Sequence, residues 1–252
     1  MKKIVLLIIV FAGVGLALLS FTSGKDVRAE KTGFAVIELF TSQGCSSCPA
    51  ADKLLSEIVK EKNDTKVFGL SFHVSYWNYL GWKDPYSSKE YTQRQRDYGA
   101  FFRNSSIYTP QMVVNGKREF VGSSQANAKK AIEEALSQPA VHHLNLDVKR
   151  THEELIIHYD MEGPLNDVVL NIALVERNIA TEVKRGENRN RTLRHDNVVR
   201  SFKSIPARKK GQLMLPFANN PKLENGSVIA YVQNKGTFEI SGATGIELTV
   251  LK

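Results

Sequence analysis

The distribution of apolar and polar residues divides the chain into two parts. Between residues 33 and 138, short β-branched and aromatic runs alternate with apolar residues spaced at i, i+3, i+4 and i+7. The runs predict strands, and the spacing predicts amphipathic helices that cover them. The expected order is strand, helix, strand, helix, two strands and a final helix. This alternation favours an α/β domain whose first strands are parallel.

Local signals place the individual elements of this first part. Pro49 suits the first turn of a helix, where its missing N–H costs nothing. Ser87 and Glu90 form a capping box that predicts the start of the next helix. Asn115-Gly116 predicts a hairpin between the last two strands. The expected strands are 34–40, 66–74, 112–114 and 118–121, and the expected helices are 50–60, 87–102 and 124–136.

From residue 141 onward, apolar and polar residues alternate with the period of strands. The main runs are 144–148, 155–159, 170–174, 198–202, 213–215, 228–232 and 246–250. Several short strands without intervening helices predict an all-β, sandwich-like domain. We therefore expect a first domain at 33–139 and a β-sandwich domain at 141–252.

The first 29 residues have the pattern of a targeting segment. Lys2 and Lys3 precede an apolar run at 4–21, and Val-Arg-Ala at 27–29 is a suitable cleavage site. We favour a cleaved signal peptide, and the run also has about the minimum length of an uncleaved membrane anchor. Both interpretations predict export to the periplasm or the extracellular space, with membrane attachment through this segment only.

Composition and charge narrow the class of partner. The chain is 42% hydrophobic and 24% charged, which is ordinary for a soluble globular protein. Removing residues 1–29 takes away four basic residues and one acidic residue, which lowers the net charge from +8 to +5. This mildly basic balance is weak evidence for a polyanionic partner, and we expect no nucleic acid partner.

Cys45 and Cys48, the only cysteines, lie between an expected strand and an expected helix. A CxxC pair in this position is typical of a thioredoxin-like redox site. The helix dipole acidifies a cysteine at the helix N-terminus, and the thiolate is the species that attacks disulfides. We expect Cys45 to be the exposed nucleophile and Cys48 its buried resolving partner. A purely structural bridge is less favoured, because so small a loop gains little stability from closure.

Thr109-Pro110 comes immediately before the expected hairpin strand at 112–114. In thioredoxin-like proteins a cis-proline at this place packs against the CxxC pair, and its neighbouring backbone pairs with the substrate. We therefore expect a cis bond here, although few X–Pro bonds are cis in folded proteins. A trans proline that starts an edge strand is the alternative.

His73 ends the second expected strand and is followed by an aromatic run at 76–82 that contains Trp77 and Trp82. The ends of such strands face the functional crevice of an α/β sheet, so His73 could tune a thiolate or act as a third metal ligand. A histidine hydrogen-bonded in a lid or core is the interpretation we favour. The aromatic run is either a rim that binds a substrate polypeptide, together with Thr109, or an insertion packed onto the domain.

A polar cluster at 184–197 carries Arg189, Arg191, Arg194 and His195. Arginine forks could recognise phosphate or carboxylate groups. A solvated hairpin loop braced by local ion pairs is the reading we favour. A third interpretation is that the loop folds back onto the first domain near the CxxC pair.

Four stretches together resemble a bacterial secreted family that is catalogued as a domain of unknown function in the thioredoxin-like superfamily. They are 38–49, 73–85, 108–116 and 187–200, which contain GCSSCP, HVSYWNYLGW, YTPQMVVNG and ENRNRTLRHDNVVR. The resemblance implies a thioredoxin-like fold and export, and it makes the loop at 185–200 part of the family pattern. It implies no particular substrate or reaction. The family usually has acidic residues where Ser75 and Asn78 stand, which argues against a carboxylate working beside His73.

The leading hypothesis is a thiol–disulfide oxidoreductase in which Cys45 and Cys48 exchange with a protein thiol or disulfide, Pro110 shapes the groove, and no organic cofactor takes part. One alternative is a carrier that binds Cu(I) through Cys45, Cys48 and His73, since soft thiolates select that ion. Another is a non-catalytic binding module that uses the thioredoxin fold as a scaffold and the basic loop as its contact.

Overall fold

A computed structural model describes residues 33–61, 66–217 and 220–250 of the chain. The predictions for residues 1–29, which concern the signal peptide or anchor, lie outside the described residues. Within the part that is described, no helix is both long and apolar enough to cross a membrane. All the described residues belong to one compact unit.

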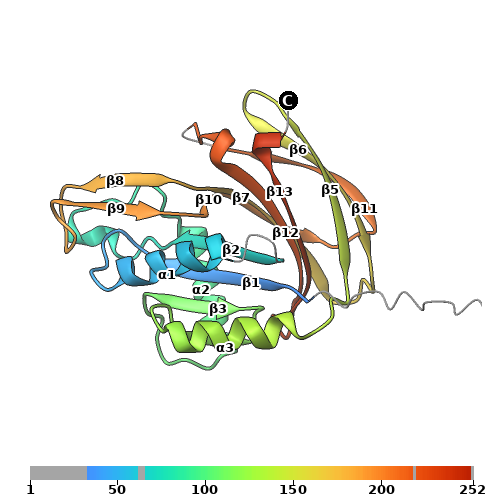
Figure 1. The fold of residues 1–252 in the computed structure, drawn as a ribbon, viewed down its shortest axis with the longest axis horizontal. Coiled ribbons are helices and arrows are strands. Elements are labelled where there is room, and N and C mark those ends of the chain that lie inside the picture. Colours follow the sequence, from blue (N-terminus) through green and yellow to red (C-terminus); the bar gives the residue numbers. More distant parts are fainter. Residues whose placement is uncertain (1–32, 62–65, 218–219, 251–252) are drawn as a thin grey trace, which may run out of the picture. The chain divides into compact units, whose positions relative to one another are not determined.

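The first part of the chain has the predicted order of elements. β1 pairs with β2 in parallel and with β3 in antiparallel, and β3 pairs with β4 across the predicted hairpin. Side chains of α1 and α3 share one apolar cluster with β1 and β3, while α2 contributes to a cluster that includes other side chains of β1 and β2 (Figure 1). The elements are β1 (Ala35–Thr41), α1 (Cys48–Glu61), β2 (Val67–His73), α2 (Lys89–Phe101), β3 (Gln111–Val114), β4 (Arg118–Val121) and α3 (Gln125–Leu136).

Helix α2 begins one residue later than the capping box predicts. Ser88 is its N-cap, and the Ser88 hydroxyl accepts a hydrogen bond from the Glu90 N–H at 3.0 Å. The Ser87 hydroxyl instead donates to the carbonyl of Asp84 at 2.8 Å. The predicted cap was therefore wrong by one position, because Ser87 is engaged by the loop that precedes the helix.

The second part of the chain consists mainly of β-strands, as predicted. Three of them, β5, β6 and β11, form a separate antiparallel sheet, and β8 pairs with β9 in a hairpin. The strands are β5 (His143–Arg150), β6 (Glu154–Glu162), β7 (Val168–Glu176), β8 (Ile179–Val183), β9 (Arg191–His195), β10 (Val198–Pro206), β11 (Lys210–Pro216), β12 (Gly226–Asn234) and β13 (Ile240–Glu247).

One eight-stranded sheet crosses the boundary predicted near residue 139. Its order is β13-β12-β7-β10-β2-β1-β3-β4, so β10 of the second part lies beside β2 of the first. Val198 is paired with Ser71 in parallel, and the Ser71 N–H donates to the carbonyl of Asn197 at 2.8 Å. The two parts of the sequence therefore share one β-sheet.

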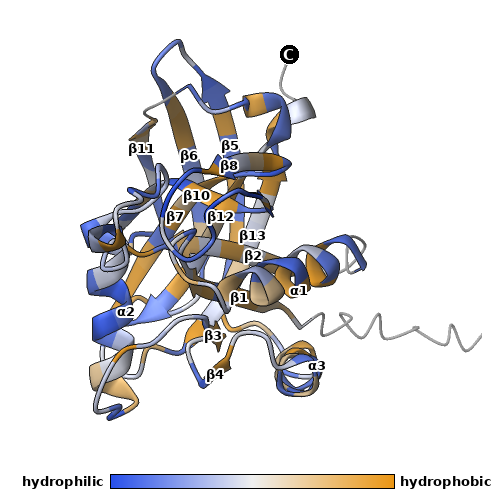
Figure 2. Ribbon diagram, turned by 90° about the vertical axis from the view of Figure 1, so that its left-hand side faces the viewer, coloured by the Kyte–Doolittle hydropathy of each residue, from blue (hydrophilic) through white to orange (hydrophobic). Residues whose placement is uncertain are grey.

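Hydrophobic residues are concentrated in the strands (Figure 2), and those that are buried form clusters between the elements. One cluster fills the space between the three-stranded sheet and strands β7 and β12, with Leu155, Ile157 and Leu170 fully buried in it. A second cluster joins the two parts, because it contains Phe72 of β2 and Tyr231 of β12.

A buried carboxylate, Glu38, also joins the two parts. Glu38 on β1 is fully buried, and its carboxylate lies 2.7 Å from Nη2 of Arg94 on α2. The same carboxylate accepts hydrogen bonds from the hydroxyls of Tyr98 and, at 2.6 Å, Tyr231. Burial and the neighbouring carboxylate hold the pKa of Tyr98 well above its ordinary value. Glu38 thus binds donors from α2 and from β12 at once.

Candidate redox site

The two cysteines form a disulfide at the junction between β1 and α1. Cys48 is the first residue of α1, and Cys45 lies in the turn before it. The Cys48 N–H donates to the carbonyl of Cys45 at 3.3 Å, and the Cys45 N–H donates to the carbonyl of Ser42 at 3.1 Å. Free N–H groups and the dipole at a helix N-terminus favour negative charge. A thiolate formed at Cys45 on reduction would be stabilised by this position.

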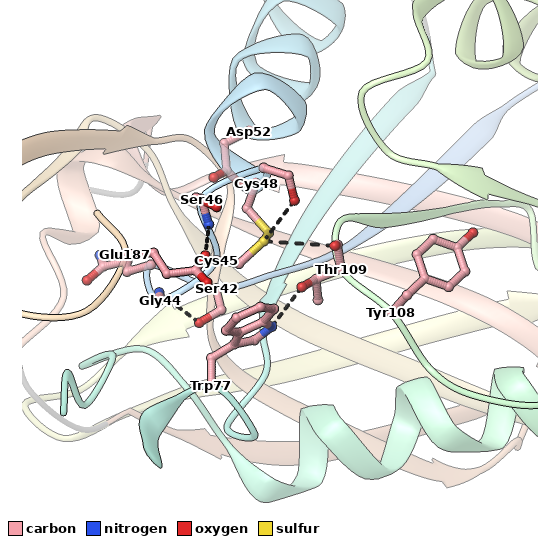
Figure 3. Close-up of a disulfide and its surroundings, with 12 residues drawn as sticks. Ser42, Gly44, Cys45, Ser46, Cys48, Asp52, Trp77, Tyr108, Thr109 and Glu187 are labelled. Atoms are coloured by element: carbon pink, nitrogen blue, oxygen red, sulfur yellow. Dashed lines mark hydrogen bonds between the residues drawn. A yellow bond between two sulfur atoms is a disulfide. The ribbon is translucent and has the colours of Figure 1, made fainter. Parts of the chain in front are cut away.

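Thr109 lies beside the disulfide, immediately before β3. The Thr109-Pro110 bond is cis, as predicted. The carbonyl oxygen of Thr109 lies 3.9 Å from Cys45 Sγ, and the Ser47 hydroxyl lies 3.3 Å from the same sulfur (Figure 3). A backbone acceptor therefore stands next to Cys45 Sγ.

Trp77 and Trp82 are half-buried, and each donates a hydrogen bond into the site. Nε1 of Trp77 donates to the Thr109 hydroxyl at 2.8 Å, and Nε1 of Trp82 donates to Oε1 of Gln43 at 3.1 Å. Figure 3 shows the Trp77 indole beside Thr109 near the disulfide. Both indoles brace the segments that carry the cysteines and the cis-proline, whereas Tyr79 of the same aromatic run is 80% exposed.

Both sulfur-bearing residues are buried, which corrects the prediction for Cys45. Its exposed fraction is 1%, and that of Cys48 is 0%. The loop between β8 and β9 covers the turn: Nδ2 of Asn188 donates to the carbonyls of Gln43 and Cys45 at 3.0 and 2.9 Å. Cys45 is therefore less accessible than the CxxC motif alone would suggest, and the second part of the chain contacts its backbone.

Glu187 of the same loop holds the dipeptide between the cysteines. Its Oε2 accepts a hydrogen bond from the Ser46 N–H at 2.8 Å. This contact with Ser46 lowers the pKa of the Glu187 carboxyl below its usual range. The loop thus places a carboxylate at the N-terminal end of α1, beside the redox pair. Of the three readings of the 184–197 cluster, folding back onto the first part agrees with these contacts.

The predicted arginines do not converge on one point. Arg191 is exposed, and its Nη1 donates to Oδ1 of Asn188 at 2.8 Å, which orients the amide that covers Cys45. Arg189 and Arg194 are exposed. His195, in contrast, is buried and contacts residues of the first part.

His73 is fully buried, so it is not on a substrate-binding surface in this structure, which corrects that assignment. Its Nδ1 lies 2.7 Å from Oδ2 of Asp84. Burial alone would lower the pKa of His73, but the Asp84 carboxylate raises it above its usual value. Burial works in the other direction on Asp84, and His73 outweighs it, so the pKa of Asp84 is lowered.

The presence of Asp84 corrects a second expectation. The sequence argued against a carboxylate beside His73, because Ser75 and Asn78 stand at positions that are usually acidic. The carboxylate comes instead from the end of the following loop, where Asp84 also accepts hydrogen bonds from the N–H groups of Gln43 and Tyr86 at 2.8 and 3.0 Å. The loop turns back toward β1, which brings Asp84 to His73.

A second buried acid–histidine pair consists of His195 and Asp52. The sequence identified His195 but not its acidic partner. Nδ1 of His195 lies 3.4 Å from Oδ2 of Asp52, and Nε2 of His195 lies 3.4 Å from Nε2 of Gln43. The rings of His195 and His73 are in edge contact, with centroids 4.9 Å apart. Asp52 follows Cys48 by four residues, so helical spacing places it on the same face of α1. That spacing is the signal that could have identified it.

Metal binding has no ready site in the part of the chain that the structure describes. No group of three or more His, Cys, Asp or Glu side chains is arranged there to hold an ion. Of the ligands suggested for Cu(I), Cys45 and Cys48 are bonded to each other, and Nδ1 of His73 is engaged by Asp84.

The order of elements and the disulfide at the start of α1 define a thioredoxin-like protein. Comparison of sequences supports this class: the chain is 32% identical to a thioredoxin of Methanocaldococcus jannaschii over 102 residues, which is 40% of this chain and 92% of that protein. The match leaves more than half of the chain unaccounted for.

A family that spans both parts accounts for most of the chain. The protein belongs to the family described as "Protein of unknown function (DUF1223)", which matches residues 36–233. It is also similar to the crystal structure of protein AGR_C_4864 from Agrobacterium tumefaciens, with 28% identity and a TM-score of 0.64. That likeness covers 86% of this chain and 96% of the other, so the combination of the two parts recurs in a solved structure.

Proposed function

We propose that the protein is an exported thiol–disulfide oxidoreductase that acts through Cys45 and Cys48. The observation that carries the proposal is the disulfide at the N-terminus of α1, with the Thr109 carbonyl beside Cys45 Sγ. The position of Cys45 favours its thiolate as a leaving group and as a nucleophile. Export rests on the pattern of residues 1–29 and suits a redox-active disulfide.

The reaction is a transfer of the disulfide bond. A substrate thiolate attacks Cys45 Sγ, the bond between Cys45 and Cys48 breaks, and its electron pair leaves with Cys48 Sγ. A second substrate thiol then displaces Cys45 and closes the substrate disulfide. The reverse sequence reduces a substrate disulfide and restores the protein disulfide. Cys45, Cys48 and Pro110 are the proposed reactive and groove residues, and Thr109 offers backbone groups to an extended substrate.

The groups around Cys45 limit the access of a substrate to it. Asn188 and Glu187 bind the backbone of the turn, and Trp77 is hydrogen-bonded to Thr109 beside it. Because Cys45 is only 1% exposed, we expect a macromolecular substrate to displace segments around it before the substrate sulfur reaches Cys45. The Trp77 and Trp82 indoles then border the opening, which gives them a role in contacting substrate.

The test is the redox equilibrium of the cysteine pair. The protein is equilibrated in graded thiol buffers, and alkylated cysteines are counted by mass. A reversible midpoint between about −270 and −120 mV would support an exchange enzyme, and its value would separate reductant from oxidant. A bridge that resists reduction below about −300 mV would mark a structural disulfide and reject the proposal.

The burial of Cys45 favours one other candidate, a non-catalytic binding module. In that case the exposed Arg194 and Arg191 form the contact, and the disulfide only fixes the turn. Replacing both arginines with alanine would then abolish the biological activity, whereas Cys45→Ser would preserve it. The redox proposal requires the opposite result for Cys45→Ser.

A further inference from the structure

Two acid–histidine pairs lie together beside the disulfide. His73 and Asp84 form one pair, and His195 and Asp52 form the other. All four side chains are buried, and Asp52 has the largest exposed fraction of the four, 4%. The two imidazole rings touch edge to face, so the pairs form one continuous buried cluster.

The two pairs differ in how completely their polar atoms are satisfied. Asp84 accepts hydrogen bonds from His73, from the Gln43 N–H and from the Tyr86 N–H. Neither carboxylate oxygen of Asp52 makes a hydrogen bond, and Nδ1 of His195, although 3.4 Å away, makes none either. A buried polar group without a partner costs free energy, and a carboxylate costs more than a neutral group. Such a group calls for a function.

Asp52 lies close to the proposed redox pair. It follows Cys48 by one helical turn, and Figure 3 shows it among the residues that surround the disulfide. Cys48 is fully buried, so bulk water does not supply its proton directly. Every opening of the disulfide leaves a thiolate on Cys48, and every closing must remove the proton from a Cys48 thiol.

We infer that Asp52, together with His195, is the internal proton donor and acceptor of Cys48. The inference deepens the proposed function and rests on it. On opening, the electron pair of the S–S bond leaves with Cys48 Sγ, and a proton held by the Asp52–His195 pair moves onto that sulfur. On closing, the pair takes the proton back, and the Cys48 thiolate attacks the mixed disulfide on Cys45 and expels the substrate thiolate.

The charged groups that surround the Asp52–His195 pair have partners of their own. His73 and Asp84 face it from β2 and the following loop, with Nδ1 of His73 2.7 Å from Oδ2 of Asp84. Arg200 on β10 is held by Glu176 on β7. Lys60, on α1, lies 3.0 Å from Asp196, next to His195. Opposite charges thus pair with each other around the cluster, whereas the Asp52 carboxylate oxygens and Nδ1 of His195 make no hydrogen bond.

A chromogenic aromatic disulfide tests the proposed function and the inferred proton transfer separately. Mixed with the reduced full chain, it releases one equivalent of coloured thiolate when Cys45 forms a mixed disulfide, and a second when Cys48 displaces the remaining aromatic group. The first phase reports on the proposed function, and the second reports on the proton transfer. General base catalysis contributes about 100-fold or more to a rate. We therefore expect Asp52→Asn to slow the second phase at neutral pH by at least about tenfold and to leave the first phase unchanged.

The matched control is Glu57→Gln, which removes the same charge from an exposed position of the same helix, where Glu57 pairs with Lys53 at 3.4 Å. Both phases should keep their wild-type rates in this variant. At a pH high enough to ionise Cys48 by itself, Asp52→Asn should recover the control's second-phase rate. A purely structural effect of the substitution would not disappear with pH.

His195→Gln is the second variant and should slow the same phase, so the test stands even if Asp52→Asn fails to fold. A second phase that is as fast in the folded variants as in Glu57→Gln would overturn the inference. A second phase accelerated by Asp52→Asn would also overturn it, because the carboxylate would then act only as a repulsive charge. A wild-type chain that shows no first phase would instead reject the proposed function.

Discussion

Replacing Glu38 with glutamine should destabilise this protein more than neutralising any other carboxylate named above. The carboxylate accepts hydrogen bonds from Arg94, Tyr98 and Tyr231, and it is fully buried. Glutamine has a single acceptor oxygen and adds two N–H donors, so at least one of the three donors loses its partner. The Arg94 guanidinium, whose side chain is 13% exposed, also loses its counter-charge.

The expected cost follows from this arrangement. Removing one partner of a buried ion pair costs about 3–5 kcal/mol, because it leaves an uncompensated buried charge. For a unit of this size each kcal/mol lowers the melting temperature by roughly 2–4 °C, so we expect a decrease of about 6–20 °C. Urea unfolding followed by far-ultraviolet circular dichroism measures the free energy, and calorimetry measures the temperature.

The control is Glu239→Gln, which breaks a pair with Lys117 at 2.9 Å whose side chains are about half exposed. Exposed pairs contribute about 0–1 kcal/mol, so this variant should unfold close to the wild type. Because Glu38 binds both α2 and β12, its loss should shift the transition of the whole chain. A cost for Glu38→Gln below about 1 kcal/mol, or equal to that of the control, would refute the argument that the buried Glu38 carboxylate holds the two parts together.

Three further substitutions or conditions probe the site. Asn188→Ala removes the hydrogen bonds to the carbonyls of Gln43 and Cys45, so alkylation of Cys45 in the reduced protein should be faster than in the wild type, and an unchanged rate would argue against the loop as a cover. Asp84→Asn removes the carboxylate that raises the pKa of His73, and NMR titration should find that pKa lowered below 6.5 by burial, whereas an unchanged value would contradict the assignment. In the wild type, the contribution of His73 to stability is present below pH 6.5 and is lost as pH rises through its raised pKa, while that of Asp84 is present above pH 3.8 and is lost as pH falls through its lowered pKa. Urea midpoints should therefore decline on both sides, and the alkaline decline should be absent in Asp84→Asn.

The first part of the fold could be predicted from the sequence because its signals are local. Apolar spacing identifies α1 and α3, and Asn115-Gly116 identifies the turn between β3 and β4. The cap of α2 was misplaced by one residue, since Ser87 and Ser88 are chemically equivalent and only the Ser87 contact with Asp84 distinguishes them.

The site could be predicted only where it depends on neighbours in the sequence. Cys45, Cys48 and Pro110 form recognisable short motifs, and the structure brings Thr109 to Cys45 as expected. Asp84 reaches His73 through the return of a loop. Asn188 reaches Cys45 across 143 residues of sequence, and no local pattern encodes such a contact.

The second part of the chain changes what the thioredoxin-like part can do. The likeness to thioredoxin covers 40% of the chain, and the CxxC motif predicts an exposed Cys45, which the structure shows buried. Here the β8–β9 hairpin adds Asn188 over the Cys45 backbone, Glu187 at the start of α1, and His195 against Asp52. The first two contact the backbone around the disulfide and place a carboxylate beside it, and the third puts a buried imidazole next to the helix that begins at Cys48. Differences in reactivity from a single-domain thioredoxin should therefore originate in this hairpin, since the cysteine motif itself is held in the usual position between a strand and a helix.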